Sequence, residues 1–425
     1  MSPLSREWRL LRRDRGALLW IAVTFLAALF AVVTGVAEQR RQVAEIDALI
    51  IADATDRNAM LAKQEDWGSA AYYAFHLTYD PPAPASFMTQ GERDSYPWKH
   101  RVRMLALEGQ IYEADVGSPT VALIGRFDLA FMAAVLLPLL LIVLLYDLRS
   151  SEADAGRLDL LEATASTGGF WRTRGLLRAG LLTLALIAPL LLGGVAVGTS
   201  AFGLLAAVLL IVAHAAFWTW LVLTLGAWRK PTPVLLATLL GGWLLLAVVV
   251  PLLGRTVIDQ SVTFPPLAEI ALEQRETVND AWDLPKAATM DAFVARHPDW
   301  TEHAKIDGPF EWKWYYAFQQ VGDQAVEPLS RAYRDGLRRR EDQLDRLSWL
   351  SPPMLVTRSL QRLSNSDLRA LLAYDGRVRD FHQRLREFHY PKLFLDEPFS
   401  PEAAESLPAF AATAEPQASS PTAAL

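Results

Sequence analysis

The side chains that could bind a metal ion lie in two groups in the second half of this sequence. The denser group consists of His297, Asp299, Glu302 and His303. A zinc site needs several such side chains around one point, but histidines six residues apart lie on different faces of a helix, and Pro298 interrupts the segment. The second group, His382 and His389, has both rings on one helical face. We interpret the first group as polar surface and expect no metal ion at either group.

The familiar catalytic motifs are missing from the sequence. It has no G-x-x-x-x-G-K-[ST] phosphate loop, and therefore no site of this type for the phosphates of ATP. The patterns H-E-x-x-H, G-x-S-x-G and G-x-G-x-x-G are also absent. With no cysteine, the chain has no disulfide and no thiolate nucleophile. We expect a protein that is not itself an enzyme and binds no cofactor, so any energy input must come from elsewhere.

Five apolar runs of about twenty residues dominate the sequence. A helix of roughly twenty residues crosses a hydrocarbon core of about 30 Å, so each run predicts a membrane span. The predicted spans are 16–37, 127–148, 179–200, 201–228 and 234–254. The sequence therefore predicts an all-α polytopic membrane protein in contact with the lipid bilayer. A net charge of -6 and a pI near 5.7 give no reason to expect a nucleic-acid partner.

Arginine placement predicts the orientation of these spans, because positively charged loops tend to stay cytoplasmic. Arginines concentrate in residues 1–15 and 149–178, and Arg229 and Lys230 occupy the short loop 229–233. We therefore expect a plasma or inner membrane protein with a cytoplasmic N-terminus. The segments 38–126 and 255–410 and the C-terminus are expected outside, although Arg40 and Arg41 weaken the signal at the first span.

Two polar residues fall within or beside the spans. His214 is the one histidine inside an apolar run, and an ionisable side chain at that depth is a candidate for a transport or relay role. A neutral imidazole that is hydrogen-bonded to a neighbouring helix is the commoner alternative. Asp128, at the start of the second span, is grouped with His214 as a possible intramembrane polar site.

The two outer segments differ in their predicted structure. In 38–126, residues 41–65 have helical periodicity and 101–106 alternate as a strand does, which predicts a small α+β domain. The segment 255–410 predicts a larger, mainly helical domain, with a kink or restart at Pro328 and new helices after Ser351 and Asp367. Its aromatic run 311–318 is either a domain core, which we favour, or a contact for an apolar substrate or for lipid. Residues 411–425 are expected to be disordered.

Residues 4–15 have an amphipathic pattern. Leu4, Trp8 and Leu11 share one helical face, and Arg6, Arg9 and Arg13 share the opposite one. A helix of this kind lies in the headgroup layer of a membrane, and we expect Trp8, Arg9, Leu11 and Arg13 to form the contact with that layer. The alternative is a positively charged flank that only sets the topology.

The segment 149–178 contains a second amphipathic stretch. We expect Ser151 to cap a helix with Asp154 three residues on, and Leu158, Leu161 and Ala165 to share one face, with Glu162 at its edge. Thr167, Gly168 and Gly169 are expected to end this helix. A short helix held between two spans suits docking into a groove of a cytoplasmic partner. The alternative is a connector that lies on the surface.

At these residues the chain resembles the permease subunits of ABC exporters of the type-2 class, which have the type V fold, and specifically a branch with large outer domains. The resemblance covers most of the chain and rests on Glu7–Arg9, Ser95–Pro97, Gly125–Phe131, Leu136–Pro138, Tyr146–Leu148 and the pattern of Glu152, Gly156 and Leu158. It implies that the residues coupling to the ATPase are Glu152, Gly156, Leu158, Leu160, Leu161 and Glu162. In this family a sixth span follows the second outer domain. The sequence to Leu425 contains no such run, so we expect either a five-helix variant or a truncated sequence.

The resemblance implies a permease subunit that pairs with an identical or paralogous permease and docks separate ABC ATPase subunits, which bind ATP and Mg²⁺. The alternative is an assembly subunit that moves no substrate and transmits ATPase-driven motion to an extracytoplasmic partner. A continuous path between spans 2 and 5 would favour transport. Closed spans with a large exposed outer surface would favour the assembly role.

Overall fold

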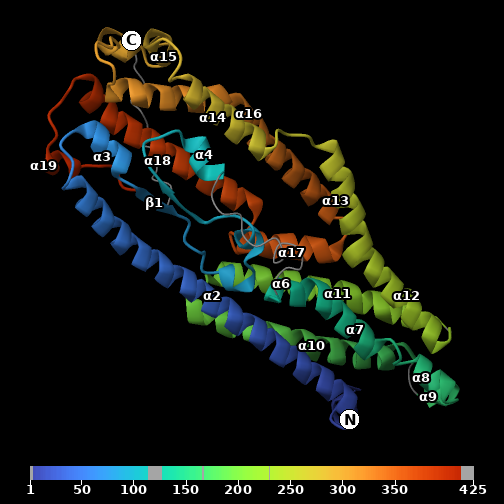
Figure 1. Ribbon diagram of the computed structural model, residues 1–425. Helices are drawn as coiled ribbons and strands as arrows, with labels where there is room; N and C mark the ends of the chain where they lie inside the picture. The colour runs from blue at the N-terminus through green and yellow to red at the C-terminus, as the bar shows by residue number, and fades with distance from the viewer. Residues whose placement is uncertain (1–2, 113–126, 165–166, 229, 413–425) are drawn as a thin grey trace, which may run out of the picture.

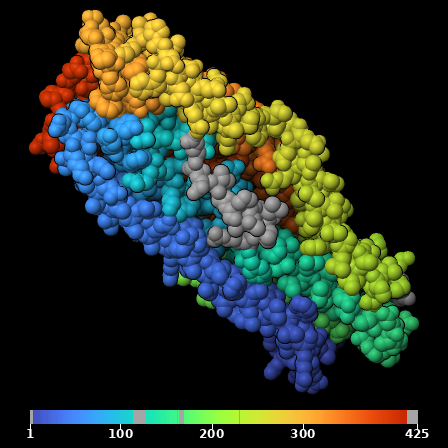
Figure 2. All heavy atoms as spheres, in the orientation of Figure 1, coloured from blue at the N-terminus to red at the C-terminus, as the bar shows by residue number. Residues whose placement is uncertain are grey.

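The computed structural model describes residues 3–112, 127–164, 167–228 and 230–412. The chain forms an elongated body in which the apolar helices occupy one end and the polar segments occupy the other (Figure 1 and Figure 2). Long helices dominate both ends, and the described residues contain only one pair of short strands. The prediction of a mainly helical polytopic protein is confirmed at this level.

Among the described residues, five helical segments are long and apolar enough to cross a membrane, as predicted. Spans 1, 3 and 4 are α2 (Arg15–Leu61), α10 (Thr167–Val197) and α11 (Ala201–Gly226). Span 2 comprises α6 (Leu129–Phe131), η3 (Met132–Leu136) and α7 (Leu137–Leu145), and span 5 comprises α12 (Thr232–Leu244), η4 (Leu245–Val249) and α13 (Val250–Ser261). Three helices extend beyond their expected ends. Span 1 continues as one helix to Leu61, α10 begins at Thr167 rather than near 179, and α13 continues to Ser261 rather than 254.

Proline residues explain the irregular turns of spans 2 and 5. The π-helical turns η3 and η4 end two residues before Pro138 and Pro251, whose rings lack an N–H and displace the carbonyl four residues earlier. Side chains from other elements bind the carbonyls in these turns. The His214 ring nitrogen Nε2 lies 3.2 Å from the oxygen of Ala134, and the Trp243 indole donates to that of Val135 at 3.1 Å. The irregular turns therefore become contact points between spans 2, 4 and 5.

The outer elements come from both polar segments. From the first segment they are α3 (Trp67–Tyr73), β1 (His76–Tyr79), η1 (Ser86–Met88), η2 (Gly91–Asp94), β2 (Lys99–Val102) and α4 (Leu107–Tyr112). From the second they are α14 (Leu267–Asp280), α15 (Lys286–Val294), η5 (Pro298–His303), α16 (Trp312–Ser348), α17 (Pro352–Leu363), α18 (Leu368–Phe394) and α19 (Pro401–Ala404). The antiparallel strands pair His76 with Val102.

The expected division into two outer domains, 38–126 and 255–410, needs correction. One hydrophobic core contains Leu61 and Trp67 from the first segment together with Trp314, Tyr316 and Tyr390 from the second. In Figure 1 the strand β1 and the helix α4 lie against α18 and α16. The two segments share this core, so they form one domain together with the outer end of α2.

Several local predictions in the second segment are confirmed. Trp314, Tyr316 and Phe318 are at most 2% exposed, so the aromatic run is a core element. Ser351 caps α17 by accepting from the Met354 N–H, and Asp367 caps α18 by accepting from that of Ala370, each at 3.2 Å. The restart at Pro328 does not occur, because α16 continues through it as one helix.

Helix α17 connects the outer domain to the spans. Val356 and Leu360 belong to the hydrophobic core of the spans, and α17 contacts η3, η4 and α11. The Ser351 hydroxyl donates to the carbonyl of Leu246 in η4 at 2.6 Å. On its other side, the buried Ser364 hydroxyl donates to the carbonyl of Ala85 at 2.9 Å. The outer ends of spans 2 and 5 are thus covered by a helix that belongs to the outer domain.

Candidate functional site

The connector helix α1 (Pro3–Leu11) is held against the start of α10 by buried charge pairs. Glu7 is only 2% exposed, and one of its carboxylate oxygens accepts from Nε of Arg174 at 2.9 Å. Arg178 donates to Asp14, the N-cap residue of α2, at 2.7 Å. The Arg174 guanidinium also lies over the Phe170 ring, 4.5 Å from its centroid. These contacts fix α1 relative to spans 1 and 3.

The apolar face that the sequence predicts for α1 is only partly buried in the structure. Leu11 is 2% exposed and packs beside the spans, whereas Leu4 and Trp8 are 57% and 45% exposed. Arg9 and Arg13 are exposed, as the amphipathic pattern predicted. The sequence interpretation gave Glu7 no role. Its one available signal was that Glu7 is the only acidic residue among the arginines of residues 1–13.

In segment 149–178 the structure has two short helices in place of the single helix that we expected. Helix α8 (Ser150–Asp154) and helix α9 (Leu158–Thr164) are separated at Gly156, whose φ of 69° is left-handed. Ser151 does not cap α8, because its hydroxyl donates to the carbonyl of Asp147. The residues expected to end the helix, 167–169, form the first turn of α10 instead. A glycine in the left-handed region, which the periodicity could not reveal, accounts for the break.

The exposed side of α9 also differs from the expected one. Leu158 is 6% exposed and packs within this chain, whereas Leu160 is 69% exposed. Leu161 is half-buried, and the side chain of Glu162 lies outside the described residues. Arg157 donates to Glu152 across the break between α8 and α9 at 2.8 Å. Among the expected coupling residues whose side chains are described, Leu160 therefore has the most exposed apolar side chain, and Leu158 is buried.

Two hydrogen bonds join α8 to the turn between spans 4 and 5. The Thr232 hydroxyl donates to a carboxylate oxygen of Asp154 at 2.6 Å. Arg149, directly before α8, donates to the carbonyl of Ala227 at 3.3 Å. Since α8 also follows span 2 directly, it is connected to spans 2, 4 and 5.

His214 and Asp128, which the sequence analysis grouped as one possible intramembrane polar site, bond to different partners. His214 is 4% exposed and bonds to Ala134, whereas Asp128 caps α6 by accepting from the Phe131 N–H at 2.8 Å. Ala134 lies six residues along span 2 from Asp128, or about 9 Å at 1.5 Å per residue. Each residue therefore has a local structural partner.

The histidines considered as metal ligands also have other contacts. His382 and His389 are buried, and their ring nitrogens lie 3.0 Å and 2.9 Å from the carbonyls of Arg103 and Leu385. The ring of His297 stacks on that of Phe293. Within the described residues, no group of three or more His, Asp or Glu side chains is arranged to hold a metal ion.

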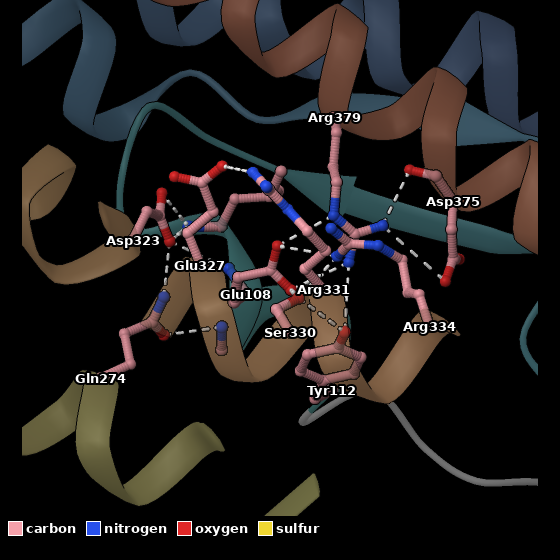
Figure 3. Close-up of polar contacts among 12 residues, drawn as sticks. Glu108, Tyr112, Gln274, Asp323, Glu327, Ser330, Arg331, Arg334, Asp375 and Arg379 are labelled. Atoms are coloured by element: carbon pink, nitrogen blue, oxygen red, sulfur yellow. Dashed lines mark hydrogen bonds and ion pairs between the residues drawn. The ribbon is translucent and has the colours of Figure 1, made fainter. Parts of the chain in front are cut away.

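A buried ion cluster in the outer domain was not anticipated from the sequence (Figure 3). Arg379 on α18 donates to both carboxylate oxygens of Glu108 on α4, each at 2.8 Å. The Ser330 hydroxyl donates to the same carboxylate at 2.8 Å, and Arg334 lies 3.7 Å from it. Burial by itself would raise the pKa of Glu108, but these hydrogen bonds and the positive charges hold that pKa below its usual value.

Most of this cluster belongs to the segment that the comparison with known families recognises. Residues 268–413 match DUF3526, a domain of unknown function. No curated protein and no solved structure matches the chain. The DUF3526 segment runs from α14 to α19, and its core is completed by α3, α4 and the two strands from the first outer segment.

Asp323 joins the DUF3526 segment to α4. Its carboxylate accepts from the backbone N–H of Leu107 at 2.8 Å and from Arg386 and Gln274 at 2.5 Å each (Figure 3). The Gln274 amide oxygen accepts from the N–H of Gly109 at 2.7 Å. The first turn of α4 has N–H groups that its own helix cannot satisfy, and the DUF3526 segment provides the acceptors.

Asp375 lies beside the Glu108 cluster (Figure 3). Burial raises the pKa of its carboxyl to about 6, with the Glu108 charge adding to the shift while Arg379 and Arg334 oppose it. The cluster contains charges of both signs, and its members come from both outer segments. It therefore connects the two segments.

Proposed function

We propose that this chain is the permease subunit of an ATP-driven ABC exporter in the inner membrane. In this proposal it pairs with a second permease and binds separate ATPase subunits through α8, α9 and α1. The family resemblance of residues 125–162 supports this assignment. The absence of a phosphate loop from the sequence supports the separation of ATP hydrolysis from this chain.

One observation carries the proposal. Helix α9 exposes Leu160 at the end of the molecule opposite the outer domain, while α8 is joined to the turn between spans 4 and 5 by the bond from Thr232 to Asp154. An exposed leucine on a short, anchored helix suits a groove on a partner. A partner that binds α9 differently in its open and closed states can shift the spans, whereas equal binding would shift nothing.

The test compares two exposed leucines. Burying a leucine contributes about 1.5–3 kcal/mol, so Leu160→Asp should weaken ATPase docking by roughly tenfold or more. Leu272→Asp is the control, because Leu272 is 55% exposed on α14 in the outer domain. Both variants are purified from native membranes at matched expression, and the copurified ATPase and its turnover are measured. Equal ATPase recovery from Leu160→Asp and from the wild type would refute the coupling role.

The second candidate function is the assembly subunit, and the position of α17 favours it. This helix covers η3 and η4 at the outer ends of spans 2 and 5, and the Trp243 indole joins the two spans directly. Spin labels on spans 2 and 5 of the complete complex would distinguish the two roles. Transport requires the distance between the labels to change on ATP binding. The assembly role is supported if that distance stays constant while labels on the outer domain move.

A further inference from the structure

A groove opens along spans 2, 3 and 4 towards α8. It has a volume of about 840 Å³, and its lining is largely apolar. Leu184 and Trp220 line the groove and are 55% and 62% exposed, so it faces the surroundings of the spans rather than their core. On α11 the lining extends from Val212 to Gly226, a rise of fourteen residue steps or about 21 Å. One leaflet of a hydrocarbon core is about 15 Å deep, so the groove is long enough for an acyl chain.

The groove meets a smaller polar cleft at its end beside α8. This cleft has a volume of about 380 Å³ and shares Arg149 and Gly226 with the groove. Its charged lining residues are Arg149, Lys230, Asp154 and Asp159. The cleft therefore offers two cations and two carboxylates, one of which already accepts from Thr232.

Ser150 provides an independent indication of a polar ligand. This residue lines the polar cleft and is 7% exposed. Among the described residues, its hydroxyl oxygen has no hydrogen-bond partner. A buried polar atom without a partner is unfavourable, and a bound acceptor would remove that cost.

We propose that the groove and the cleft together bind one aminophospholipid, such as phosphatidylethanolamine, from the leaflet beside α8. An acyl chain occupies the groove. The phosphate lies near Arg149, Lys230 and the Ser150 hydroxyl, and the ammonium lies near the cleft carboxylates. Basic pockets between membrane helices bind lipid phosphates, and the two carboxylates favour a zwitterionic head group over a purely anionic one.

This site goes beyond the coupling function, because lipid binding requires no ATPase. It lies against α8 and beside Leu158, so a bound lipid would hold α8 and α9 in the arrangement described. The leaflet is defined by its position beside α8. The proposal therefore stands even if the predicted orientation of the chain is reversed.

The decisive variant fills the groove without disturbing the fold. A side chain at Gly180, which lines the groove, would meet no other atom within 4 Å, so Gly180→Leu is compatible with the fold. Gly242→Leu is the matched control, because Gly242 on α12 has the same free space and lines neither opening. The full-length chain is purified into micelles with defined phosphatidylethanolamine or phosphatidylglycerol, and retained lipid is measured by native mass spectrometry.

We expect one retained phosphatidylethanolamine per chain, and at least tenfold weaker retention in Gly180→Leu but not in Gly242→Leu. Lys230→Gln and Ser150→Ala should each weaken retention several-fold while the melting temperature of the lipid-free chain is unchanged. Three outcomes would overturn the proposal: equal retention by the two glycine variants, phosphatidylglycerol held as tightly as phosphatidylethanolamine, or equal binding of the free head group glycerophosphoethanolamine.

Discussion

Glu7 on α1 accepts a hydrogen bond from Arg174 on α10 at 2.9 Å, and the two residues are 167 positions apart in the chain. Their side chains are 2% and 15% exposed. A pair this far from water interacts more strongly than a surface pair, and removing one partner leaves the other charge without compensation. The pair therefore determines where the connector helix lies relative to the third span.

We expect Glu7→Ala to lower the free energy of unfolding by about 2–3 kcal/mol, because Arg174 then loses a charged partner inside the protein. Arg157→Ala is the control. Its pair with Glu152 has an arginine that is 62% exposed, so the change should be within about 1 kcal/mol. Denaturation in detergent measures both. Equal effects of the two substitutions would show that the Glu7 pair contributes no more than a surface contact.

The predicted orientation of the spans can be tested with single cysteines, since the chain has none of its own. The Lys305 side chain is 83% exposed in the outer domain, and Leu160 is 69% exposed on α9. A membrane-impermeant maleimide added to intact cells should label Lys305→Cys and leave Leu160→Cys unlabelled until the cells are opened. The reverse labelling pattern would invert the topology.

Asp375 should make the stability of the outer domain depend on pH. The pKa of its carboxyl is about 6 in the folded chain against 3.8 for an ordinary aspartate, so between these values the folded chain holds a proton that the unfolded chain has lost. The free energy of unfolding therefore falls as the pH rises from 4 to 6, by up to about 3 kcal/mol for this group.

The variant Asp375→Asn removes this titration. Its free energy of unfolding should be less dependent on pH between 4 and 6 than that of the wild type, and the difference between the two should stay constant above about pH 7. Urea denaturation followed by tryptophan fluorescence across this range measures the effect. Parallel pH profiles for the two proteins would assign the pH dependence to other groups.

Gly68 on α3 shows how closely the two outer segments approach. A Cβ atom at this position would lie 1.8 Å from Cγ of Trp312, a contact that no side chain tolerates. We expect Gly68→Ala to destabilise the protein by about 1–3 kcal/mol through displacement of the indole. Gly376→Ala on α18 is the control, because its Cβ would meet no atom within 4 Å and alanine favours a helix. Thermal unfolding of both variants provides the comparison, and a neutral Gly68→Ala would mean that Trp312 can move aside freely.

The membrane spans and the helix starts at Ser351 and Asp367 could be predicted because their causes are local. An apolar run of about twenty residues is stable only out of water, whatever it packs against. Ser351 and Asp367 act as caps through N–H groups three residues away, and such contacts depend on short-range sequence alone. The aromatic core of α16 was predicted for a related reason, since several large rings rarely remain exposed together.

The contacts of polar residues such as His214 and Glu7 could not be predicted, because their partners are distant in the sequence. His214 was predictable as a buried histidine, but its acceptor exists only because Pro138 disturbs span 2 beside it. Glu7 was named only as part of the resemblance and was given no partner, because an acidic residue on a short helix normally faces water. Neither contact leaves a periodic signal in the sequence.

The sequence by itself determined that the chain is a helical membrane protein with two polar segments, because hydrophobicity and helix caps act within about twenty residues. Only the tertiary structure decided that these segments form one outer domain and that α9 exposes Leu160 and buries Leu158. Both outcomes depend on which surface a neighbouring element covers. Asp323, which satisfies the first turn of α4 from more than two hundred residues away, shows why such contacts appear only once the chain has folded.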